Sequence, residues 1–383
     1  MPKVVPEMAK TSPRQRRKIR YAVIGQGYIS QIAVLPAFDN ASRNSELVAL
    51  ISDDAVKLNK LSKTYQVSST GTYDDYDALL ESGKIDAVYI ALPNHMHCDY
   101  TVRAARAGIH VLCEKPMAVT DAECKKMIEA CDKYRVKLMI AYRLHFEKAN
   151  LSAVEIVQSG KIGEPRLFNS LFTMQVRDED NIRLQKHMGG GPLFDIGIYC
   201  LNAARYLFRE DPVEVFAMTA NIDQQRFSEV EEMASVVMRF PQERLATFSC
   251  SFGAADTSTY QVVGAKGHLR VDPAYEMVGD LKYSLTVKGR VSERSFPKRD
   301  QFAPELLYFS DCILNDRTPE PSGREGRIDV HIINAMHKSA QTGRPVRIQP
   351  LAQDERPSLK QAKRRPAVDK PELVNAKKPS GEE

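Results

Sequence analysis

The sequence has 383 residues, of which 43% are apolar and 27% charged, a composition typical of globular proteins rather than disordered or fibrous ones. At about 100–200 residues per domain, this length predicts two domains. The formal charge is +5, but residues 1–20 carry a net +6 and residues 351–383 a net +2, which leaves −3 for residues 21–350. Nucleic-acid binders carry their basic residues on a folded surface, so we expect no nucleic-acid partner and interpret the basic ends as solvated tails.

No run of about 18 apolar residues is present, so we expect no membrane-spanning segment. Arg16 and Arg17 are not followed by an apolar stretch of signal-peptide length. The seven cysteines form no C-x-x-C pair, which argues against a disulfide framework and against a zinc site. These features predict a reduced, cytoplasmic protein without a metal.

The first 150 residues alternate short apolar runs with helical patterns, which indicates βαβ units, a parallel sheet and an α/β fold class. The expected strands are residues 20–24, 47–51, 86–91, 109–113 and 137–142. The expected helices are residues 28–38, 55–65, 97–107 and 121–134, with a shorter one near 78–80.

Beyond residue 165 the expected strands follow one another without crossover helices. In the expected strand at residues 245–252, the apolar residues Ala246, Phe248 and Cys250 alternate with Thr247 and Ser249. This two-residue period suits an antiparallel sheet with one packed face. The segment after 350 is rich in Pro, Lys and Glu, which predicts a disordered tail or an extended arm. The expected strands are 166–176, 213–219, 234–240 and 245–252, and the expected helices 193–207, 304–314 and 324–342.

Residues 25–30 read Gly-Gln-Gly-Tyr-Ile-Ser, between an expected strand and an expected helix. This is the context that a dinucleotide fingerprint requires. The first glycine allows the tight turn, and the second lets a pyrophosphate approach the helix N-terminus. Ser30 replaces the usual third glycine but is also small. An ordinary glycine turn is the alternative; the motif favours a cofactor that contacts Gly25, Gly27, Tyr28 and Ile29.

The end of the second expected strand normally reports the type of dinucleotide. An acidic residue there binds a ribose 2′-hydroxyl, whereas a basic residue can accept a 2′-phosphate. Ser52 and Lys57 could hold a phosphate, and Asp53 could hold a bare ribose. The residues alone therefore leave NAD and NADP open, and a helix cap or an exposed lysine is an equal alternative for each.

Two further stretches suggest substrate contacts. Glu114-Lys115-Pro116 follows an expected strand, at the end where open α/β sheets bind ligands; a plain surface turn is the alternative. Glycines 189–191 lead into a helix in which Asp195 and Tyr199, four residues apart, share one face. Gly197 in that helix costs about 1 kcal/mol relative to alanine, so we expect a close neighbour there.

Residues 94–98 read Asn-His-Met-His-Cys, a spacing too tight to chelate one metal ion easily. We expect this loop to touch the cofactor's ribose or to cap the next helix. Arg143 and His145 follow the last strand of the first half, and we expect them either to face the substrate or to solvate a loop.

Together these stretches resemble the Gfo/Idh/MocA family of sugar oxidoreductases, and within it the members like glucose–fructose oxidoreductase and other aldose oxidoreductases. The resemblance implies a doubly wound Rossmann domain at 19–145 and an α/β domain with a large, mostly antiparallel sheet at 146–348. A basic arm, 1–18, and a tail or arm, 349–383, flank them. The stretches that carry the resemblance are residues 25–30, 86–94, 114–116 and 195–199, with 142–145, 183–184 and 189–206 behind the finer match.

The resemblance also implies the cofactor and the residues that hold it. Ser52 and Lys57 match the NADP-using branch, which favours NADP over NAD, whereas Asp53 departs from that pattern. The implied cofactor-binding residues are Gly25, Gly27, Tyr28, Ile29, Ser52, Lys57, Leu92, Pro93, Asn94, His97, Glu114, Lys115 and Arg143.

The reaction implied is hydride transfer between a sugar carbon and nicotinamide, which needs a proton acceptor as well as a hydride acceptor. Tyr199 is the expected acid/base, helped by the cation Lys115, and Asp195 is expected to orient a sugar hydroxyl and hold Lys115. No metal is needed, because nicotinamide carries the redox chemistry. The expected catalytic residues are Lys115, Asp195 and Tyr199, and the expected substrate-binding residues are Lys115, Arg143, Arg183, Asp195 and Tyr199.

Three functions stay open at this point. The first is an oxidoreductase that retains NADP and recycles it with a second sugar. The second is a simple dehydrogenase that releases NAD(P)H, and the third is a non-catalytic dinucleotide or sugar sensor. The resemblance implies a homodimer or homotetramer formed through the open face of the second sheet. We expect residues 1–18 to cross a neighbouring subunit or to cover the adenine end of the cofactor.

Overall fold

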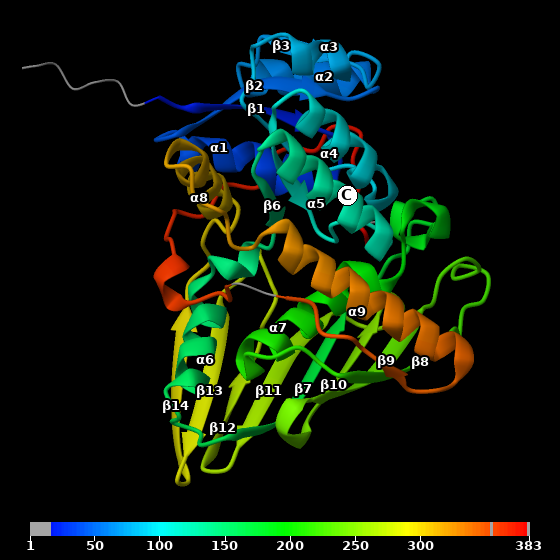
Figure 1. Ribbon diagram of the computed structural model, residues 1–383, viewed down its shortest axis with the longest axis vertical. Helices are drawn as coiled ribbons and strands as arrows, with labels where there is room; N and C mark the ends of the chain where they lie inside the picture. Colours follow the sequence, from blue (N-terminus) through cyan, green and yellow to red (C-terminus); the bar gives the residue numbers. More distant parts are fainter. Residues whose placement is uncertain (1–16, 353–354, 381–383) are drawn as a thin grey trace, which may run out of the picture.

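The computed structural model describes residues 17–352 and 355–380 and contains two sheets, one above the other in Figure 1. All but the last two residues of the predicted basic arm, 1–18, lie outside the described residues. No helix in the described parts of the chain is long and apolar enough to cross a membrane.

The first sheet has six strands in the order β3-β2-β1-β4-β5-β6, and every neighbouring pair is parallel. This is the doubly wound Rossmann order, in which ligands bind outside the carboxyl ends of the strands where the order reverses. The strands are β1 (Ile19–Ile24), β2 (Ser45–Ile51), β3 (Ser69–Gly71), β4 (Ala87–Ile90), β5 (His110–Glu114) and β6 (Leu138–Ala141). The helices are α1 (Leu35–Ala41), α2 (Ala55–Thr64), α3 (Tyr76–Glu81), α4 (His97–Arg106) and α5 (Asp121–Tyr134).

The second sheet has nine strands in the order β14-β13-β12-β11-β7-β10-β9-β8-β15, and only the β7–β10 pair is parallel. The predicted α/β fold with a parallel and a mostly antiparallel sheet is thereby confirmed. The strands are β7 (Pro165–Thr173), β8 (Glu214–Ala220), β9 (Met233–Phe240), β10 (Arg244–Ser251), β11 (Thr257–Gly264), β12 (Gly267–Val271), β13 (Leu281–Val287), β14 (Arg290–Phe296) and β15 (Val346–Arg347).

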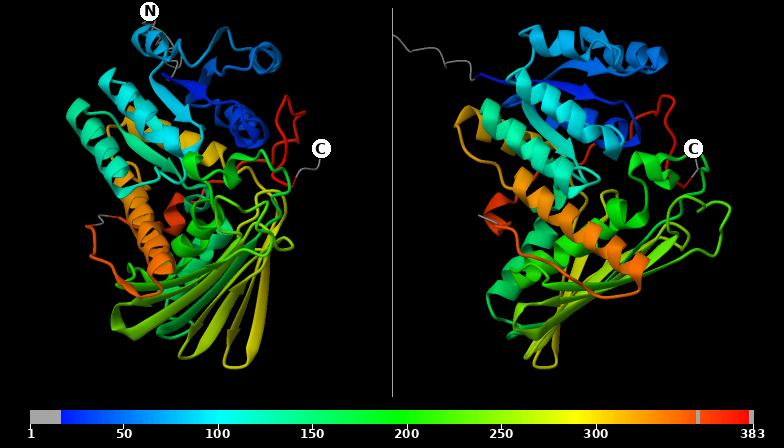
Figure 2. Two further views of the ribbon diagram at one scale, coloured as in Figure 1. Left: turned by 90° about the vertical axis from the view of Figure 1, so that its right-hand side faces the viewer. Right: turned by 45° about the vertical axis from the view of Figure 1, so that its right-hand side comes forward.

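Helices cover one face of the second sheet, and Figure 2 shows the other face uncovered. The covering helices are α6 (Lys148–Gln158), α7 (Ile198–Phe208) and α9 (Gly323–Thr342). The alternation expected in β10 is present: Ala246, Phe248 and Cys250 are buried under the helices, whereas Leu245 is 38% exposed on the open face. Helix α6, strand β3 and strands β11 to β15 are not predicted from the sequence.

Helix α8 (Ala303–Leu314) follows the second sheet in sequence but packs on the first domain. Its Leu306 and Phe309 belong to the same buried cluster as Phe38 of α1 and Tyr21 of β1. The hydroxyl groups of Tyr21 and Ser310 lie 2.8 Å apart. The first domain therefore recruits a helix from the segment that the sequence assigns to the second.

Residues 355–380 form an extended C-terminal arm that contains one short turn, η8 (Leu359–Gln361). Figure 2 shows this arm, in red, running from the second domain back along α1 to the edge of the first domain. Arg356 is ion-paired with Asp211 at 3.2 Å, and Asn40 of α1 donates to the carbonyl of Pro366. The arm is thus held against both domains.

Candidate active site

The turn after β1 leaves open space at the start of a helix. Gly25 has φ +91°, and a Cβ on it would lie 2.6 Å from the carbonyl oxygen of Ala91. A Cβ on Gly27 would meet nothing within 4 Å. The hydroxyl of Ser30 donates to the carbonyl of Gly25 at 2.6 Å, which explains how serine serves in place of a third glycine. The helix begins with π-helical turns (η1, Ser30–Val34) before α1, and the first N–H groups of a helix favour an anion such as a pyrophosphate.

The end of β2 combines acidic and basic side chains. The Asp54 carboxylate caps α2, because one of its oxygens accepts from the backbone N–H of Lys57. The other carboxylate oxygen of Asp54 lies 3.9 Å from the Nζ of Lys57. Asp53 accepts from the backbone N–H of Tyr73 at 2.9 Å, so its carboxylate is engaged by the loop after β3. Ser52 is buried and accepts from the N–H of Asp54. The open glycine turn, together with a serine and a lysine at this strand end, fits a dinucleotide that carries a 2′-phosphate.

The loop after β4 meets the second domain. The amide of Asn94 donates to the carbonyl of Gly189 at 2.7 Å, and a Cβ on Gly189 would lie 2.8 Å from that of Asn94. Leu92 is buried and Pro93 is half-buried beside it. Glycine at 189 is therefore required by close approach as well as by its φ of +79°.

His97 occupies a different place from the one expected of a cofactor ligand. Its ring is fully buried, and its two nitrogens lie 2.9 Å from the carbonyl oxygens of Leu92 and Pro116. No ring nitrogen is left to bind a ribose. His97 instead links the loop after β4 to the loop after β5, which makes it a positioning residue. A histidine at the start of a helix does not show in the sequence whether its ring will be buried.

Five side chains meet where the two domains face each other, and we call them the Lys115 cluster: Lys115, Arg143, Arg183, Asp195 and Tyr199. The ammonium group of Lys115 donates to the carboxylate and to the backbone carbonyl of Asp195, each at 2.7 Å. The guanidinium of Arg183 holds the second carboxylate oxygen at 2.6 Å. Asp195 sits in a π-helical turn (η6, Leu193–Gly197) that runs into α7.

Charge pairing decides the ionisation of this group. Burial alone would raise the pKa of Asp195, but Arg183 and Lys115 hold it well below its usual range. Burial would lower the pKa of Lys115, yet Asp195 and Tyr199 outweigh it and the pKa lies above the usual value. The side chains of Lys115 and Asp195 keep 13% and 18% of their surface exposed, so the ion pair is not completely enclosed.

Tyr199 lies between two cations. The Nζ of Lys115 is 5.1 Å from the centre of its ring, and the guanidinium carbon of Arg143 is 4.9 Å from it. The Nε of Arg143 also donates to the Tyr199 hydroxyl at 3.2 Å. The Tyr199 hydroxyl is therefore held in a fixed orientation beside cationic groups.

Arg143 is locked by groups that the sequence does not reveal. It is 6% exposed and donates to the side chain of Gln301 and to the backbone carbonyl of Tyr275. These partners hold Arg143 against Tyr199. Gln301 and Tyr275 stand in no motif, and no local signal points to them.

Glu114 is buried beside Lys115. It is 8% exposed, and its carboxylate accepts from the hydroxyl of Tyr89 at 2.7 Å and from the backbone N–H of Lys115 at 3.2 Å. Burial raises its pKa. Glu114 thus orients the backbone of Lys115. Tyr28 of the glycine turn lies near the cluster: burial raises its pKa and the neighbouring Arg183 offsets part of that rise.

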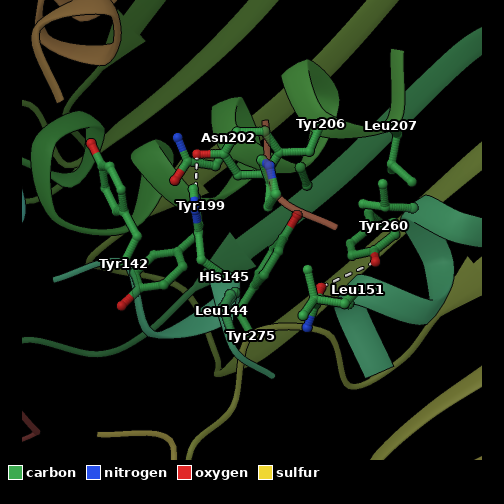
Figure 3. A pocket seen from close by; sticks show the side chains of 14 residues that line it. Tyr142, Leu144, His145, Leu151, Tyr199, Asn202, Tyr206, Leu207, Tyr260 and Tyr275 are labelled. Atoms are coloured by element: carbon green, nitrogen blue, oxygen red, sulfur yellow. Dashed lines mark hydrogen bonds between the residues drawn. The ribbon is translucent and has the colours of Figure 1, made fainter. Parts of the chain in front are cut away.

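A small apolar cavity lies behind Tyr199, on the side of α6 and α7 (Figure 3). His145 lines it and is shielded from solvent, contrary to the expectation of a solvated loop residue. It is 1% exposed, and its ring nitrogens reach the Tyr206 hydroxyl at 2.5 Å and Glu320 at 2.9 Å. Tyr260, Tyr275 and the arm residue Pro357 complete much of the lining.

Tyr206 leads to a second group of charges, the Arg205 cluster, formed by Arg205, Asp211, Glu325 and Asp329. Arg205 is fully buried and pairs with Asp211 at 2.7 Å and with Glu325 and Asp329 at 2.6 Å each. This cluster fastens α7 to α9 beneath the site. Neither this cluster nor any other part of the described chain holds three or more His, Cys, Asp or Glu side chains arranged for a metal ion.

The fold and site define a Rossmann-type oxidoreductase with a second, substrate-facing domain. Residues 19–142 match the model of an oxidoreductase family with an NAD-binding Rossmann fold, and residues 151–270 match the GFO/IDH/MocA C-terminal domain. The chain is 34% identical to a D-xylose 1-dehydrogenase [NADP(+)] from Haloarcula marismortui, over 86% of this chain and 93% of the relative. It belongs to the Gfo/Idh/MocA family, as the sequence motifs predict.

Further similarities agree with this assignment. A D-xylose 1-dehydrogenase (NADP(+)) 2 from Haloferax volcanii is 30% identical over 86% of this chain and 99% of the relative. The crystal structure of an aldose–aldose oxidoreductase from Caulobacter crescentus, complexed with glycerol, superposes with a TM-score of 0.82 at 36% identity, covering 87% of this chain and all of that chain. The predictions of family and enzyme class are thereby confirmed.

Proposed function

We propose that this protein transfers hydride between an aldose and NADP, with Tyr199 as the acid/base. The observation that carries the proposal is the contact of Tyr199 with two fixed cations: Arg143 donates to its hydroxyl, and Lys115, anchored by Asp195, lies against its ring. Two relatives named as NADP-dependent xylose dehydrogenases and a neighbour named as an aldose–aldose oxidoreductase support an aldose substrate and NADP.

Each residue has a part in the reaction. Bound nicotinamide would accept or return the hydride. The Lys115 ammonium donates a hydrogen bond to the reacting sugar oxygen, and Tyr199 removes the proton from that oxygen as hydride leaves the carbon. Asp195 holds Lys115 in position, and with Arg183 it orients a second hydroxyl of the sugar.

Ser52 and Lys57 would hold the 2′-phosphate of NADP at the end of β2, and the glycine turn would hold the pyrophosphate through Gly25, Gly27, Tyr28 and Ile29. Leu92, Pro93 and Asn94 would wall the space between the two. The occupied carboxylate of Asp53 supports NADP over NAD, because an oxygen that accepts from Tyr73 is less available to a ribose 2′-hydroxyl.

We further propose that the cofactor stays bound and is recycled by a second sugar. The test is the absorbance of the purified protein in the near-ultraviolet band of reduced nicotinamide, recorded before and after adding a panel of aldoses. A band that rises with one aldose, falls with a second and stays with the protein through gel filtration is expected. A band that leaves with free NADPH identifies a simple dehydrogenase, and no band with any aldose contradicts the proposed function.

A homodimer or homotetramer would form through the open face of the second sheet. That face carries exposed apolar side chains on four neighbouring strands: Leu167 is 51% exposed, Met218 65%, Val237 44% and Leu245 38%. Contiguous apolar side chains of this kind mark protein interfaces. A single negative charge at the centre, Val237→Asp, should reduce the mass measured by light scattering to that of one chain; a monomeric unsubstituted protein contradicts this proposal.

A reducing, cytoplasmic location is the last part of the proposal. All seven cysteines are unpaired and buried, as expected of a chain that folds where disulfides do not form. Cell fractionation with an antibody against the protein would test it, and recovery outside the cytoplasm would contradict it.

A further inference from the structure

The C-terminal arm is fastened directly to the glycine turn. The side-chain amide of Gln31 accepts from the backbone N–H of Val374 at 2.7 Å and donates to its carbonyl at 2.9 Å. The same amide nitrogen donates to the carbonyl of Gln26, inside the turn itself. Gln31 is 1% exposed and Val374 is 7% exposed, within the buried cluster of the first domain. The arm is therefore held here by two hydrogen bonds between buried residues, rather than lying loosely on the surface.

One residue further on, the arm reaches the end of β2. The amide of Asn375 donates to the Asp54 carboxylate at 2.9 Å, and this hydrogen bond is the main cause that lowers the pKa of Asp54. Asp54 caps α2 and lies beside Lys57. The arm therefore joins the two loops, after β1 and after β2, between which the adenosine half of a dinucleotide binds in a Rossmann fold.

The arm then returns to the second domain. The carbonyl of Pro379 accepts from the backbone N–H of Arg177 at 3.2 Å, in the loop that leads on to Arg183 of the Lys115 cluster. Figure 2 shows the red arm beside the first helix and its end beside the green segment that follows β7. The arm thus spans from the adenosine end of the cofactor site to the substrate domain.

We infer that residues 372–379 form the outer wall of the dinucleotide site at its adenosine end and slow the release of NADP(H). The inference rests on the proposed use of NADP and extends it, because it assigns cofactor retention to a particular segment. For the adenosine half to leave on this side, Val374 must come out of its buried position and the bonds of Gln31 and Asp54 to the arm must break.

The test compares three chains: one that ends at Ser380 and keeps every contact described above, one that ends at Pro366, and the full chain with Val374→Asp, which places a charge in the buried position. Each is loaded with NADPH and mixed with excess NADP+, and the loss of bound NADPH fluorescence gives the release rate. Far-ultraviolet circular dichroism and gel filtration check folding, and the point substitution decides the matter if the shortened chain does not fold.

We expect release from the shortened and substituted chains to be at least about tenfold faster than from the chain ending at Ser380, equivalent to about 1.4 kcal/mol. Release within about twofold of that control in a folded variant overturns the inference while leaving the proposed function intact. If the chain ending at Ser380 does not bind NADPH, both this inference and the proposed function are overturned. If that chain binds NADP but no aldose reduces it, the proposed function alone is overturned.

Discussion

The π-helical turn η6 and the helix α7 that follows it carry two charge clusters: the Lys115 cluster at Asp195 and the Arg205 cluster at Arg205. The two clusters differ in how completely their charged side chains are paired and shielded from water. In the Arg205 cluster, Arg205 is fully buried and faces three carboxylates, and Asp329 also accepts from Tyr142 and Asn202. In the Lys115 cluster, by contrast, the side chains of Lys115, Asp195 and Arg183 keep 13%, 18% and 25% of their surface exposed.

This difference separates a structural from a chemical use of similar residues. A fully buried network of charges depends on every member, because removal of one partner leaves the opposite charges buried and unpaired. An open network keeps a charged group in place while leaving one direction free for a ligand. We therefore expect substitutions in the Lys115 cluster to affect turnover and substitutions in the Arg205 cluster to affect stability.

Tyr199→Phe should give the largest effect. Loss of the hydroxyl removes the acid/base and should lower turnover about 10²–10⁴-fold, with NADP still bound and the unfolding midpoint nearly unchanged. Steady-state kinetics with the best aldose measures the change. The matched control is Tyr206→Phe on the same helix, whose hydroxyl bonds Glu325; it should cost about 1–3 kcal/mol of stability and leave turnover of the folded enzyme unchanged. Wild-type turnover in Tyr199→Phe would remove that residue from the mechanism.

Arg205→Met tests the other cluster. It leaves buried carboxylates without their cation and should lower the free energy of unfolding by about 3–5 kcal/mol, measured by urea denaturation. Arg239, 46% exposed and paired with Glu214 and Glu243 at the surface, is the control; Arg239→Met should change stability by about 1 kcal/mol or less. Equal costs for the two substitutions would contradict the distinction between closed and open clusters.

Lys115→Met should lower turnover about 10²–10³-fold, as loss of one fixed donor to the reacting oxygen does in other enzymes. Its cost in stability should be smaller than that of Arg205→Met, because Asp195 keeps Arg183 and is in contact with water. Lys125→Met, at a position 61% exposed, should change neither quantity. If Lys115→Met unfolds the protein as Arg205→Met does, then the Lys115 cluster is structural as well.

The sequence predicts Lys115, Asp195 and Tyr199 together because each stands in a local motif at a strand end or a helix start, where main-chain geometry alone determines direction. It does not predict Gln301 or Tyr275, which reach Arg143 across 158 and 132 residues. It misplaces His97 and His145 for a related reason: a polar residue beside a motif resembles a ligand until the fold shows which carbonyls and carboxylates surround it.

Strand β13 does alternate apolar and polar residues, with Leu281, Tyr283 and Leu285 separated by Lys282 and Ser284, and was overlooked. Strand β14 escapes prediction because almost all its side chains are exposed and give no apolar alternation. The C-terminal arm is difficult for the opposite reason. Its composition is that of a disordered segment, and its attachment depends on one buried side chain, Val374, and on the amide of Gln31 more than 340 residues earlier. A contact of that kind leaves no periodic trace in the sequence.

The smallest expected effect distinguishes the clusters by pH. Arg183 and Lys115 lower the pKa of Asp195 against the opposing effect of burial, so its carboxylate stabilises the folded state above the unfolded pKa of about 3.9, and this contribution is lost as the pH falls through the folded value. Asp195→Asn should therefore cost on the order of 2 kcal/mol at neutral pH, with a constant difference between about pH 5 and 8 that shrinks below about pH 4.

Urea denaturation of Asp195→Asn and of the unsubstituted protein from neutral to acidic pH measures this difference. The raised pKa of Lys115 adds no pH dependence in this window, because its contribution is complete below the unfolded pKa of about 10.4 and is lost only as the pH rises through the folded value. A difference between the two proteins that does not shrink in acid would mean that Asp195 acts through its shape and hydrogen bonds rather than its charge, and the Lys115 cluster would then resemble a neutral binding surface more than a charged catalytic one.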